Sequence, residues 1–178
     1  MGLEPGDAAA EFQLKNANPK QGGEVVSLGD IVTEQGAIIV FECNHCPYVV
    51  GSIERIEKMA ARSREYGLGF AGINANDAIK YPDDSFENMA KRAEEMSYPY
   101  LHDETQEVSM EWGAERTPEF YLLNGEGNVV YRGRLDDSPG DPTQSNTSEL
   151  MDALDAMLMG ESPLVNRTKS IGCSIKWK

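Results

Sequence analysis

Long apolar runs and positive charge are both scarce in this sequence of 178 residues. No stretch approaches the roughly 20 consecutive apolar residues that a membrane-spanning helix requires, so we expect no membrane partner. The first seven residues (MGLEPGD) contain neither a basic region nor an apolar run, and no signal peptide is visible there. The sequence therefore predicts a cytoplasmic protein.

Only 16 residues are basic, whereas 30 are acidic, and the formal net charge is −14. So large an excess of negative charge disfavours binding to nucleic acids and to anionic membranes, because both would repel it. The acidic residues are spread along the chain and are not gathered in a tail. This distribution is typical of the solvated acidic surface of an ordinary cytosolic protein, and adaptation to high salt is the alternative interpretation.

Cysteine is rare as well, and three residues cannot form the framework of several disulfides that stabilises small secreted domains. Two of the three, Cys43 and Cys46, lie only three positions apart. In a cytosolic chain such a close pair indicates redox chemistry or a metal site.

Apolar periodicity predicts strands and helices in alternation. Residues 37–41 and 69–73 are the continuous apolar runs of strands buried on both faces. Between them, apolar residues from 46 to 60 recur at helical spacing, which predicts one amphipathic helix. Further strands are expected over 12–14, 25–28, 98–101, 119–123 and 128–131, and further helices over 85–96, 106–112 and 148–159. The pattern predicts an α/β fold with a mixed central sheet and helices on both faces.

The length and the apolar content of 40% suit a single core. We expect residues 1–178 to form one domain, with an N-terminal β extension over 1–36 and an irregular C-terminal tail over 160–178. The cysteine pair falls between the first core strand and its helix, which is a thioredoxin-like order of elements.

The spacing of the cysteines suits thiol–disulfide exchange, which needs one exposed thiolate that attacks and a second thiol behind it that resolves the mixed disulfide. If the helix begins at Cys43, unpaired backbone N–H groups there would stabilise its thiolate. Cys46 would then lie one turn further on, buried on the same face. The sequence thus predicts Cys43 as the nucleophile and Cys46 as the resolving thiol.

His45 lies between the two cysteines. When protonated it would favour the thiolate of Cys43 and make the couple more oxidising than the roughly −270 mV of thioredoxin. We therefore expect His45→Ala to lower the reduction potential. The alternative is a solvent-facing histidine without effect on the thiols.

Two readings without redox chemistry stay open, namely a pair of inert thiols and a structural zinc site. Zinc usually takes four ligands, commonly as two close pairs. Here a composite site would need Cys43, Cys46, Cys173 and His102, which are far apart in the sequence. No metal and no cofactor are therefore predicted.

Five segments resemble the peroxiredoxin-like branch of the thioredoxin superfamily, the group related to alkyl hydroperoxide reductases and thiol-specific antioxidant proteins. They are residues 43–49 (CNHCPYV), 117–122 (TPEFYL), 131–137 (YRGRLDD), 6–14 (GDAAAEFQL) and 171–177 (IGCSIKW). The resemblance covers nearly the whole chain. It implies a thioredoxin-like fold with the N-terminal β extension.

The resemblance also implies that Pro118 is cis and faces the cysteine pair, and that the backbone of Thr117 pairs with a substrate chain as an added strand. From the residues alone, Pro118 is an ordinary trans proline at the start of an edge strand. Thr117 and Pro118 thereby join Cys43, Cys46 and His45 as candidate site residues.

The chain departs from the family pattern at two places. Glu42 stands where thioredoxins have tryptophan, and a carboxylate there should raise the pKa of Cys43, unless it points to solvent. Peroxiredoxins also place Thr or Ser three residues before the reactive cysteine and Pro four residues before that. The corresponding residues are Val40 and Gly36 for Cys43, or Cys43 and Ile39 for Cys46. The groups that hold the peroxide are missing.

The leading hypothesis is therefore an enzyme that reduces or exchanges protein or small-molecule disulfides, with an unidentified thiol as electron donor. Reduction is the expected direction in a reducing cytosol. The alternatives are a thiol-dependent peroxidase and a binding or metal-carrying protein on a thioredoxin scaffold. Cys173 is interpreted as a packed, idle thiol, with a second resolving thiol or an attachment point as the alternative.

Overall fold

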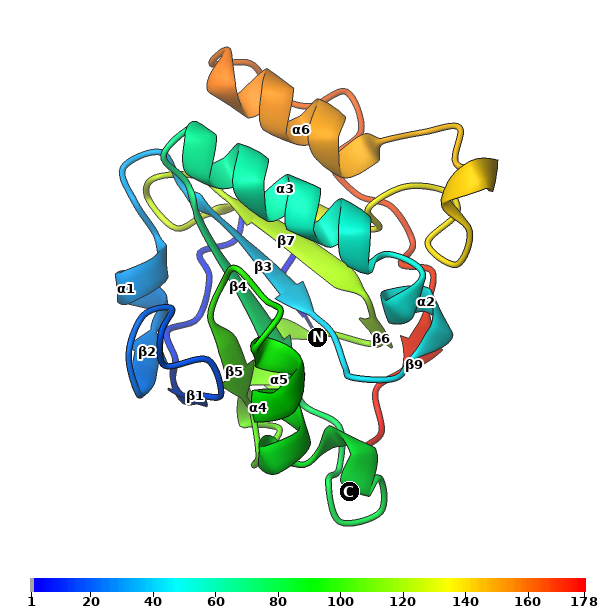
Figure 1. Ribbon diagram of the computed structural model, residues 1–178. Coiled ribbons are helices and arrows are strands. Elements are labelled where there is room, and N and C mark those ends of the chain that lie inside the picture. The colour runs from blue at the N-terminus through cyan, green and yellow to red at the C-terminus, as the bar shows by residue number, and fades with distance from the viewer. Residues whose placement is uncertain (1) are drawn as a thin grey trace.

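A seven-stranded mixed sheet forms the centre of the computed structural model, which describes residues 2–178 (Figure 1). The strand order is β2-β1-β5-β4-β3-β7-β8. These strands are β1 (Gln13–Asn16), β2 (Val25–Ser27), β3 (Ala37–Phe41), β4 (Gly69–Asn74), β5 (Tyr100–His102), β7 (Glu119–Leu123) and β8 (Val129–Gly133). A separate two-stranded sheet pairs β6 (Arg116–Thr117) with β9 (Cys173–Ser174).

The helices are α1 (Leu28–Ile31), α2 (Pro47–Val50), α3 (Ile53–Glu65), α4 (Phe86–Ala93), α5 (Glu107–Trp112) and α6 (Glu149–Leu158), with short 3₁₀ turns η1 (Pro82–Asp84) and η2 (Pro142–Gln144). Across residues 2–178, none of these helices combines the length and the apolar character that crossing a membrane would take.

The pairing of the strands confirms the expected mixed sheet and its N-terminal β extension. β3 runs parallel to β4, and β4 runs parallel to β5. β7 is antiparallel to both β3 and β8, and the hairpin of β1 and β2 extends the sheet beyond β5. Phe41, the last residue of β3, is level with Glu119 at the start of β7. The loop that follows β3 therefore comes close to the chain just before β7.

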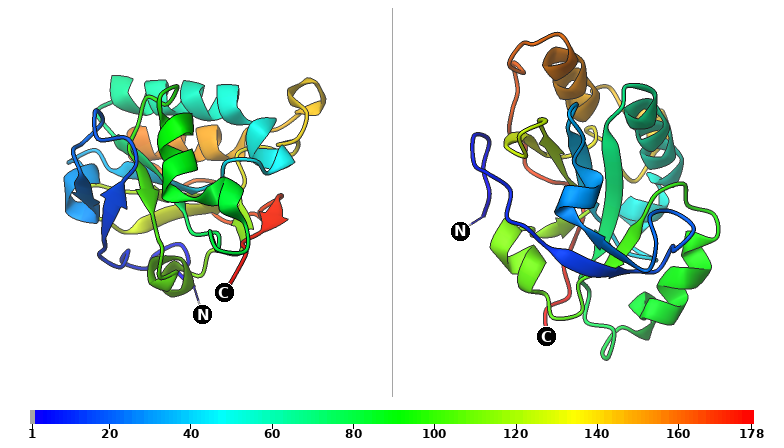
Figure 2. Two further views of the ribbon diagram at one scale, coloured as in Figure 1. Left: turned by 60° about the horizontal axis from the view of Figure 1, so that its bottom comes forward. Right: turned by 90° about the vertical axis from the view of Figure 1, so that its left-hand side faces the viewer.

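Apolar side chains alternate along the central strands, so each face of the sheet carries its own core. Helices α3, α4 and α6 pack on the face that presents Ile38 and Val40, whereas α1 and α5 cover the face that presents Ile39 and Phe41. Figures 1 and 2 show α3 and α6 together on one side of the sheet and α5 on the other. The predicted coverage of both faces is confirmed.

The helix expected over residues 46–60 is interrupted, and this part of the prediction is wrong. α2 ends at Val50 and α3 begins at Ile53, because a distant loop packs into the break. Ser52 donates from Oγ to the carbonyl oxygen of Pro139 over 2.7 Å, and a Cβ on Gly51 would lie 2.6 Å from the carbonyl oxygen of Gly140. An apolar pattern cannot report this tertiary contact.

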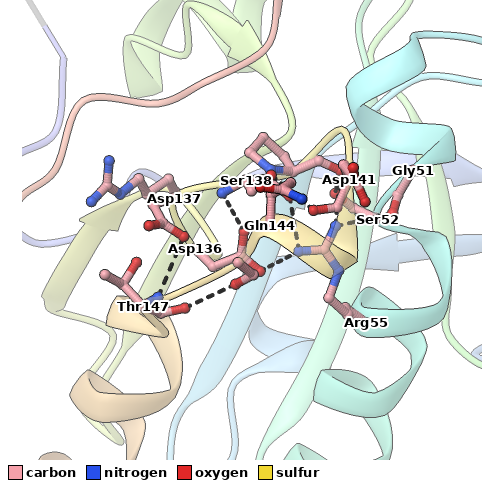
Figure 3. A network of polar contacts seen from close by, with 12 residues as sticks. Gly51, Ser52, Arg55, Asp136, Asp137, Ser138, Asp141, Gln144 and Thr147 are labelled. Atoms are coloured by element: carbon pink, nitrogen blue, oxygen red, sulfur yellow. Dashed lines mark hydrogen bonds and ion pairs between the residues drawn. The ribbon is translucent and has the colours of Figure 1, made fainter.

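Arg55 of α3 holds the same loop in place (Figure 3). It pairs with Asp136 and donates to the carbonyl oxygens of Pro139 and Ser138, at 2.9 and 3.2 Å. Asp136 also accepts the N–H of Ser138 at 2.9 Å. The loop after β8 thus supports the junction of α2 and α3, immediately behind the cysteine pair.

The tail was expected to be irregular, yet it contains β9. The earlier part of the tail also runs alongside β8, since Arg132 and Arg167 form a parallel bridge. Two-residue strands show no periodicity, which is why the sequence pattern missed this one.

Candidate active site

The Cys-x-x-Cys loop leaves β3 directly and lies against the turn before β7. Sγ of Cys43 is 3.5 Å from Oγ1 of Thr117, and Sγ of Cys46 is 3.5 Å from the carbonyl oxygen of the same residue. The Thr117–Pro118 bond is cis, as the resemblance implied. The structure thus brings Cys43, Cys46, Thr117 and Pro118 together, although more than 70 residues of sequence separate the two halves of the site.

The two cysteines do not occupy the predicted positions on the helix. Cys46, not Cys43, is the N-cap of α2, and Pro47 follows as its first residue. Proline favours the first helical position because it lacks an N–H and has a fixed φ. The N–H of Asn44 is held by Asp84 at 2.8 Å, outside the helix. The prediction of a helix that begins at Cys43 is therefore wrong.

Neither thiol is open to solvent, since Cys43 is 2% exposed and Cys46 is 4% exposed. The expectation of an exposed Cys43 is wrong as well. Both pack with Val49 in a small cluster, and Cys173 from the tail packs against that cluster. We call Cys43, Cys46, Val49 and Cys173 the thiol cluster.

Hydrogen-bond donors converge on Cys46. The Cys43 thiol is the strongest of them, and together with donors from Cys173 it outweighs burial and lowers the pKa of Cys46 to about 4. The N–H of Val49 contributes in the same direction. The pKa of Cys43 is raised by its hydrogen bond to Cys46, by burial and by the charge of Asp84. Hydrogen bonding within the pair therefore favours a thiolate on Cys46 over one on Cys43.

Glu42 is fully buried, so the alternative that it points to solvent is wrong. Its carboxylate is paired with Arg92 of α4 at 2.5 Å and accepts the hydroxyl of Tyr98 at 2.8 Å. Gly72 of β4 leaves the space for it, because a Cβ there would lie 2.3 Å from Oε2 of Glu42. The carboxylate that contributes most to raising the pKa of Cys43 is that of Asp84.

Arg92 links this buried carboxylate to the active loop. Its second nitrogen donates to the carbonyl oxygen of Cys43 at 2.9 Å and to the hydroxyl of Tyr100 at 3.1 Å. Tyr100 in turn donates to Oδ1 of Asn44 at 2.7 Å. Burial raises the pKa of Tyr100, so its hydroxyl stays protonated as a donor. Arg92 thus fixes the backbone of residue 43, and Tyr100 fixes the side chain of Asn44.

Asp84 is the second buried carboxylate under the loop. Besides the N–H of Asn44, it accepts the side-chain amides of Asn74 and Asn76 at 3.0 and 2.9 Å. His45 is half exposed, and its Nδ1 lies 3.4 Å from Oδ2 of Asp84. A protonated His45 therefore has a carboxylate partner that offsets its charge.

Sequence reasoning missed Asp84, Arg92 and Tyr100. Asp84 lies outside the predicted helices and strands, and the other two lie in a helix and a strand with no motif around them. One signal was available, because Asn74 and Asn76 follow a buried parallel strand. The carboxyl ends of parallel strands are where polar site residues gather.

Metal binding finds no support in this part of the molecule. Within residues 2–178, no group of three or more His, Cys, Asp and Glu side chains has the arrangement of a metal site. His102, which the composite zinc site required, packs over Phe86 with ring centroids 5.8 Å apart. The composite ligand set is not assembled.

Comparison with known proteins identifies the family. The Redoxin family model matches residues 4–151. A crystal structure of an uncharacterized conserved protein from Geobacillus kaustophilus is 41% identical, with a TM-score of 0.90, over 99% of this chain and 93% of that one. No curated protein sequence matches the chain.

Two more distant solved structures share the fold. The peroxidoxin BcpB from Mycobacterium tuberculosis is 19% identical, with a TM-score of 0.58, over 88% of this chain and 95% of that one. The thioredoxin domain of the thiol-disulfide oxidoreductase BVU-2223 from Bacteroides vulgatus is 16% identical, with a TM-score of 0.58, over 74% and 89%. Both are similar to this chain in architecture.

Fold and site together define a redox protein of the thioredoxin fold, peroxiredoxin-like in type. The chain belongs to the Redoxin family.

Proposed function

We propose that this protein is a thiol–disulfide oxidoreductase in which Cys46 attacks and Cys43 resolves. One observation carries the proposal: Cys46 caps α2 beside the cis-Pro118 turn, and donors from Cys43, Val49 and Cys173 stabilise its thiolate. A thiolate with a lowered pKa is the reactive form in disulfide exchange.

The reaction follows from the two positions. The Cys46 thiolate attacks one sulfur of a substrate disulfide, forms a mixed disulfide and releases the first substrate thiolate. Cys43, after losing its proton, attacks Sγ of Cys46, closes the Cys43–Cys46 disulfide and releases the second substrate thiol. A thiol donor must then reduce the protein. Arg92 and Tyr100 would hold the loop while Cys43 approaches Cys46, since they bind the carbonyl oxygen of Cys43 and the side chain of Asn44.

Family membership and one neighbour support this proposal over a binding function. The Redoxin family is redox-active as a class, and BVU-2223 is described as a thiol-disulfide oxidoreductase. Reduction is the proposed direction in a reducing compartment. The substrates would be protein or small-molecule disulfides.

A thiol peroxidase is the second candidate, because the fold is shared with the peroxidoxin BcpB. With Cys46 as the reactive residue, Cys43 occupies the place of the peroxide-holding hydroxyl, and Ile39 stands where peroxiredoxins have proline. A thiol cannot replace that hydroxyl as a strong donor. We therefore expect hydrogen peroxide to be consumed much more slowly than disulfides.

Insulin-disulfide reduction with dithiothreitol tests the proposal. Cys46→Ser should abolish the activity. The double variant Cys43→Ser, Cys173→Ser keeps Cys46 as its one thiol, so it should stop after the first step and accumulate a mixed disulfide on Cys46, visible by mass spectrometry. Full activity in both variants would refute the dithiol mechanism, and efficient peroxide turnover by the unaltered protein would favour the second candidate.

A further inference from the structure

The C-terminal tail crosses the active site as an added strand. β9 runs antiparallel to β6, with Cys173 opposite Thr117 and Ser174 opposite Arg116. The N–H of Ile175 continues the pairing to the carbonyl oxygen of Glu115 at 3.0 Å. Strand addition beside the cis-proline is the mode expected for a substrate chain. Here the protein's own tail takes that edge.

The contact depends on a glycine. A Cβ on Gly172 would lie 2.1 Å from the carbonyl oxygen of Thr117, so only glycine permits this approach. The carbonyl oxygen of Gly172 accepts a hydrogen bond from Nη1 of Arg116 at 3.1 Å.

Anchors on both sides hold the strand in place. Upstream, the N–H of Thr168 donates to the carbonyl oxygen of Arg132 at 3.1 Å. Downstream, Ile175 is buried in the core beneath the sheet, and the N–H of Lys176 donates to Asn76 at 2.9 Å. The side chain of Gln106 donates to the carbonyl oxygen of Lys176 at 2.9 Å. Cys173 is therefore carried to the thiol cluster by a fixed segment and is not a lone surface thiol.

Exposure separates the three thiols. Cys43 and Cys46 are buried, whereas Cys173 is only partly buried. Attack on a sulfur requires access to it. With the tail docked, solvent reaches the cluster at Cys173.

We infer that Cys173 is a third redox residue, through which low-molecular-weight thiols exchange electrons with Cys46 by way of a Cys46–Cys173 disulfide. This inference rests on the proposed function, because it assumes that Cys46 takes part in disulfide exchange. It also names the class of the electron donor. A small thiol can reach Cys173 while the tail is docked, whereas a polypeptide, whether donor or substrate, would have to displace β9 from the edge.

The exchange balances in three steps. First, the Cys173 thiolate attacks Sγ of Cys46 in the Cys43–Cys46 disulfide, that S–S bond breaks, and the electron pair leaves on Sγ of Cys43, which takes up a proton. A donor thiolate attacks Sγ of Cys173 in the Cys46–Cys173 disulfide, the S–S bond breaks, and the electron pair leaves on Sγ of Cys46. A second donor thiolate then attacks the donor sulfur of the mixed disulfide and releases the Cys173 thiolate, which takes up a proton. Two donor thiols are oxidised to one disulfide, and one protein disulfide is reduced to two thiols.

The electrostatics of the cluster suit this direction of attack. The lowered pKa of Cys46 makes it the better leaving group, and a thiol of low pKa leaves faster. Burial and the neighbouring Cys46 raise the pKa of Cys173 to about 11, which makes it the poorer one. Access and leaving-group acidity therefore both favour attack of the donor on Sγ of Cys173.

The experiment uses the full-length Cys43→Ser chain, which retains only Cys46 and Cys173. The protein is treated with glutathione disulfide, and its disulfides are mapped by peptide mass spectrometry. We expect an intramolecular Cys46–Cys173 disulfide without bound glutathione. Brief treatment of this form with reduced glutathione, followed by acid quenching and alkylation, should place the glutathione on Cys173 and leave Cys46 free for alkylation.

Gly172→Ala in the same background should displace β9 and slow formation of the Cys46–Cys173 disulfide by about tenfold or more, because the effective concentration of the tail thiol falls. Gly29→Ala is the matched control, since a Cβ there meets only Ser27 Oγ at 3.7 Å. It should leave the rate unchanged.

Two results would overturn the inference. Glutathione that stays on Cys46, with no link to Cys173, would refute it while leaving the proposed function intact. Failure of Cys46 to react with glutathione disulfide, together with failure of the unaltered protein to form a Cys43–Cys46 disulfide, would refute both.

Discussion

The two sides of the loop from Glu42 to Cys46 differ sharply in chemistry. On one side lie buried charges and hydroxyls, in which Arg92 joins the carboxylate of Glu42 to the backbone of Cys43. On the other side lie the thiols, Val49 and the tail, with Arg116 and Lys176 as the charged neighbours of Cys173. The first side, which we call the polar side, holds the backbone of the loop. The second, which we call the sulfur side, contains the thiols that exchange protons and electrons.

This division gives each side a separate task. Charged groups placed directly against the thiols would shift their pKa values strongly. Here the nearest buried carboxylate, Asp84, is itself saturated with hydrogen bonds from Asn44, Asn74 and Asn76. The thiolate is then stabilised chiefly by other thiols and backbone N–H groups. Changes on the polar side should therefore affect stability, and changes on the sulfur side should affect reactivity.

The largest effect should come from the sulfur side. Cys46→Ser removes the attacking thiolate and should lower the rate of disulfide exchange by at least about 10³-fold, whereas Cys43→Ser should retain the first attack. The measurement is a single-turnover reaction with a small chromogenic disulfide. Equal losses in the two variants would break the distinction between attacking and resolving thiol.

The largest effect on the polar side should be on stability. Arg92→Ala leaves Glu42 buried without a partner, and losing one partner of a buried ion pair typically costs about 3–5 kcal/mol. The free energy of unfolding in urea measures this. Lys91→Ala, an exposed neighbour in α4, is the control and should change it by less than about 0.5 kcal/mol. A similar small change in Arg92→Ala would contradict the structural role of the pair.

A smaller effect concerns the acidity of Cys46. Its pKa of about 4 lies below the ordinary 9.0. The stabilisation from this thiolate is therefore complete above about pH 9 and is lost as the pH falls through 4. Cys173→Ser removes one donor and should move the pKa of Cys46 upward. Titration of the thiolate by its ultraviolet absorbance measures the shift, and an unchanged titration curve would show that the tail does not act on Cys46.

The smallest effect should come from His45. His45→Ala should lower the reduction potential, but by less than about 30 mV, because the ring is half exposed and Asp84 offsets its charge. Glutathione redox titration of the cysteine pair tests this. A fall much larger than this, or a rise, would show that the polar side controls the thiols directly.

Local pattern was sufficient for the elements that carry the site. Residues 37–41 form β3 as predicted, because a short and continuous apolar run is typical of a strand buried on both faces. The pair at 43 and 46 and the cis bond before Pro118 were also available, the latter through resemblance. The break after Val50 was not, since a loop almost 90 residues away causes it.

Periodicity and spacing are local properties, and they establish that two thiols follow the first core strand and that the chain has the elements of a thioredoxin-like sheet. The surroundings of the two thiols come from contacts that no local pattern reports. Pro47 places the helix start at Cys46, Asp84 and Arg92 hold the loop, and the tail brings Cys173 to the site. Each of the last three contacts joins residues far apart in the chain. Because these contacts are buried, their electrostatic effect on the thiols is stronger than it would be in water.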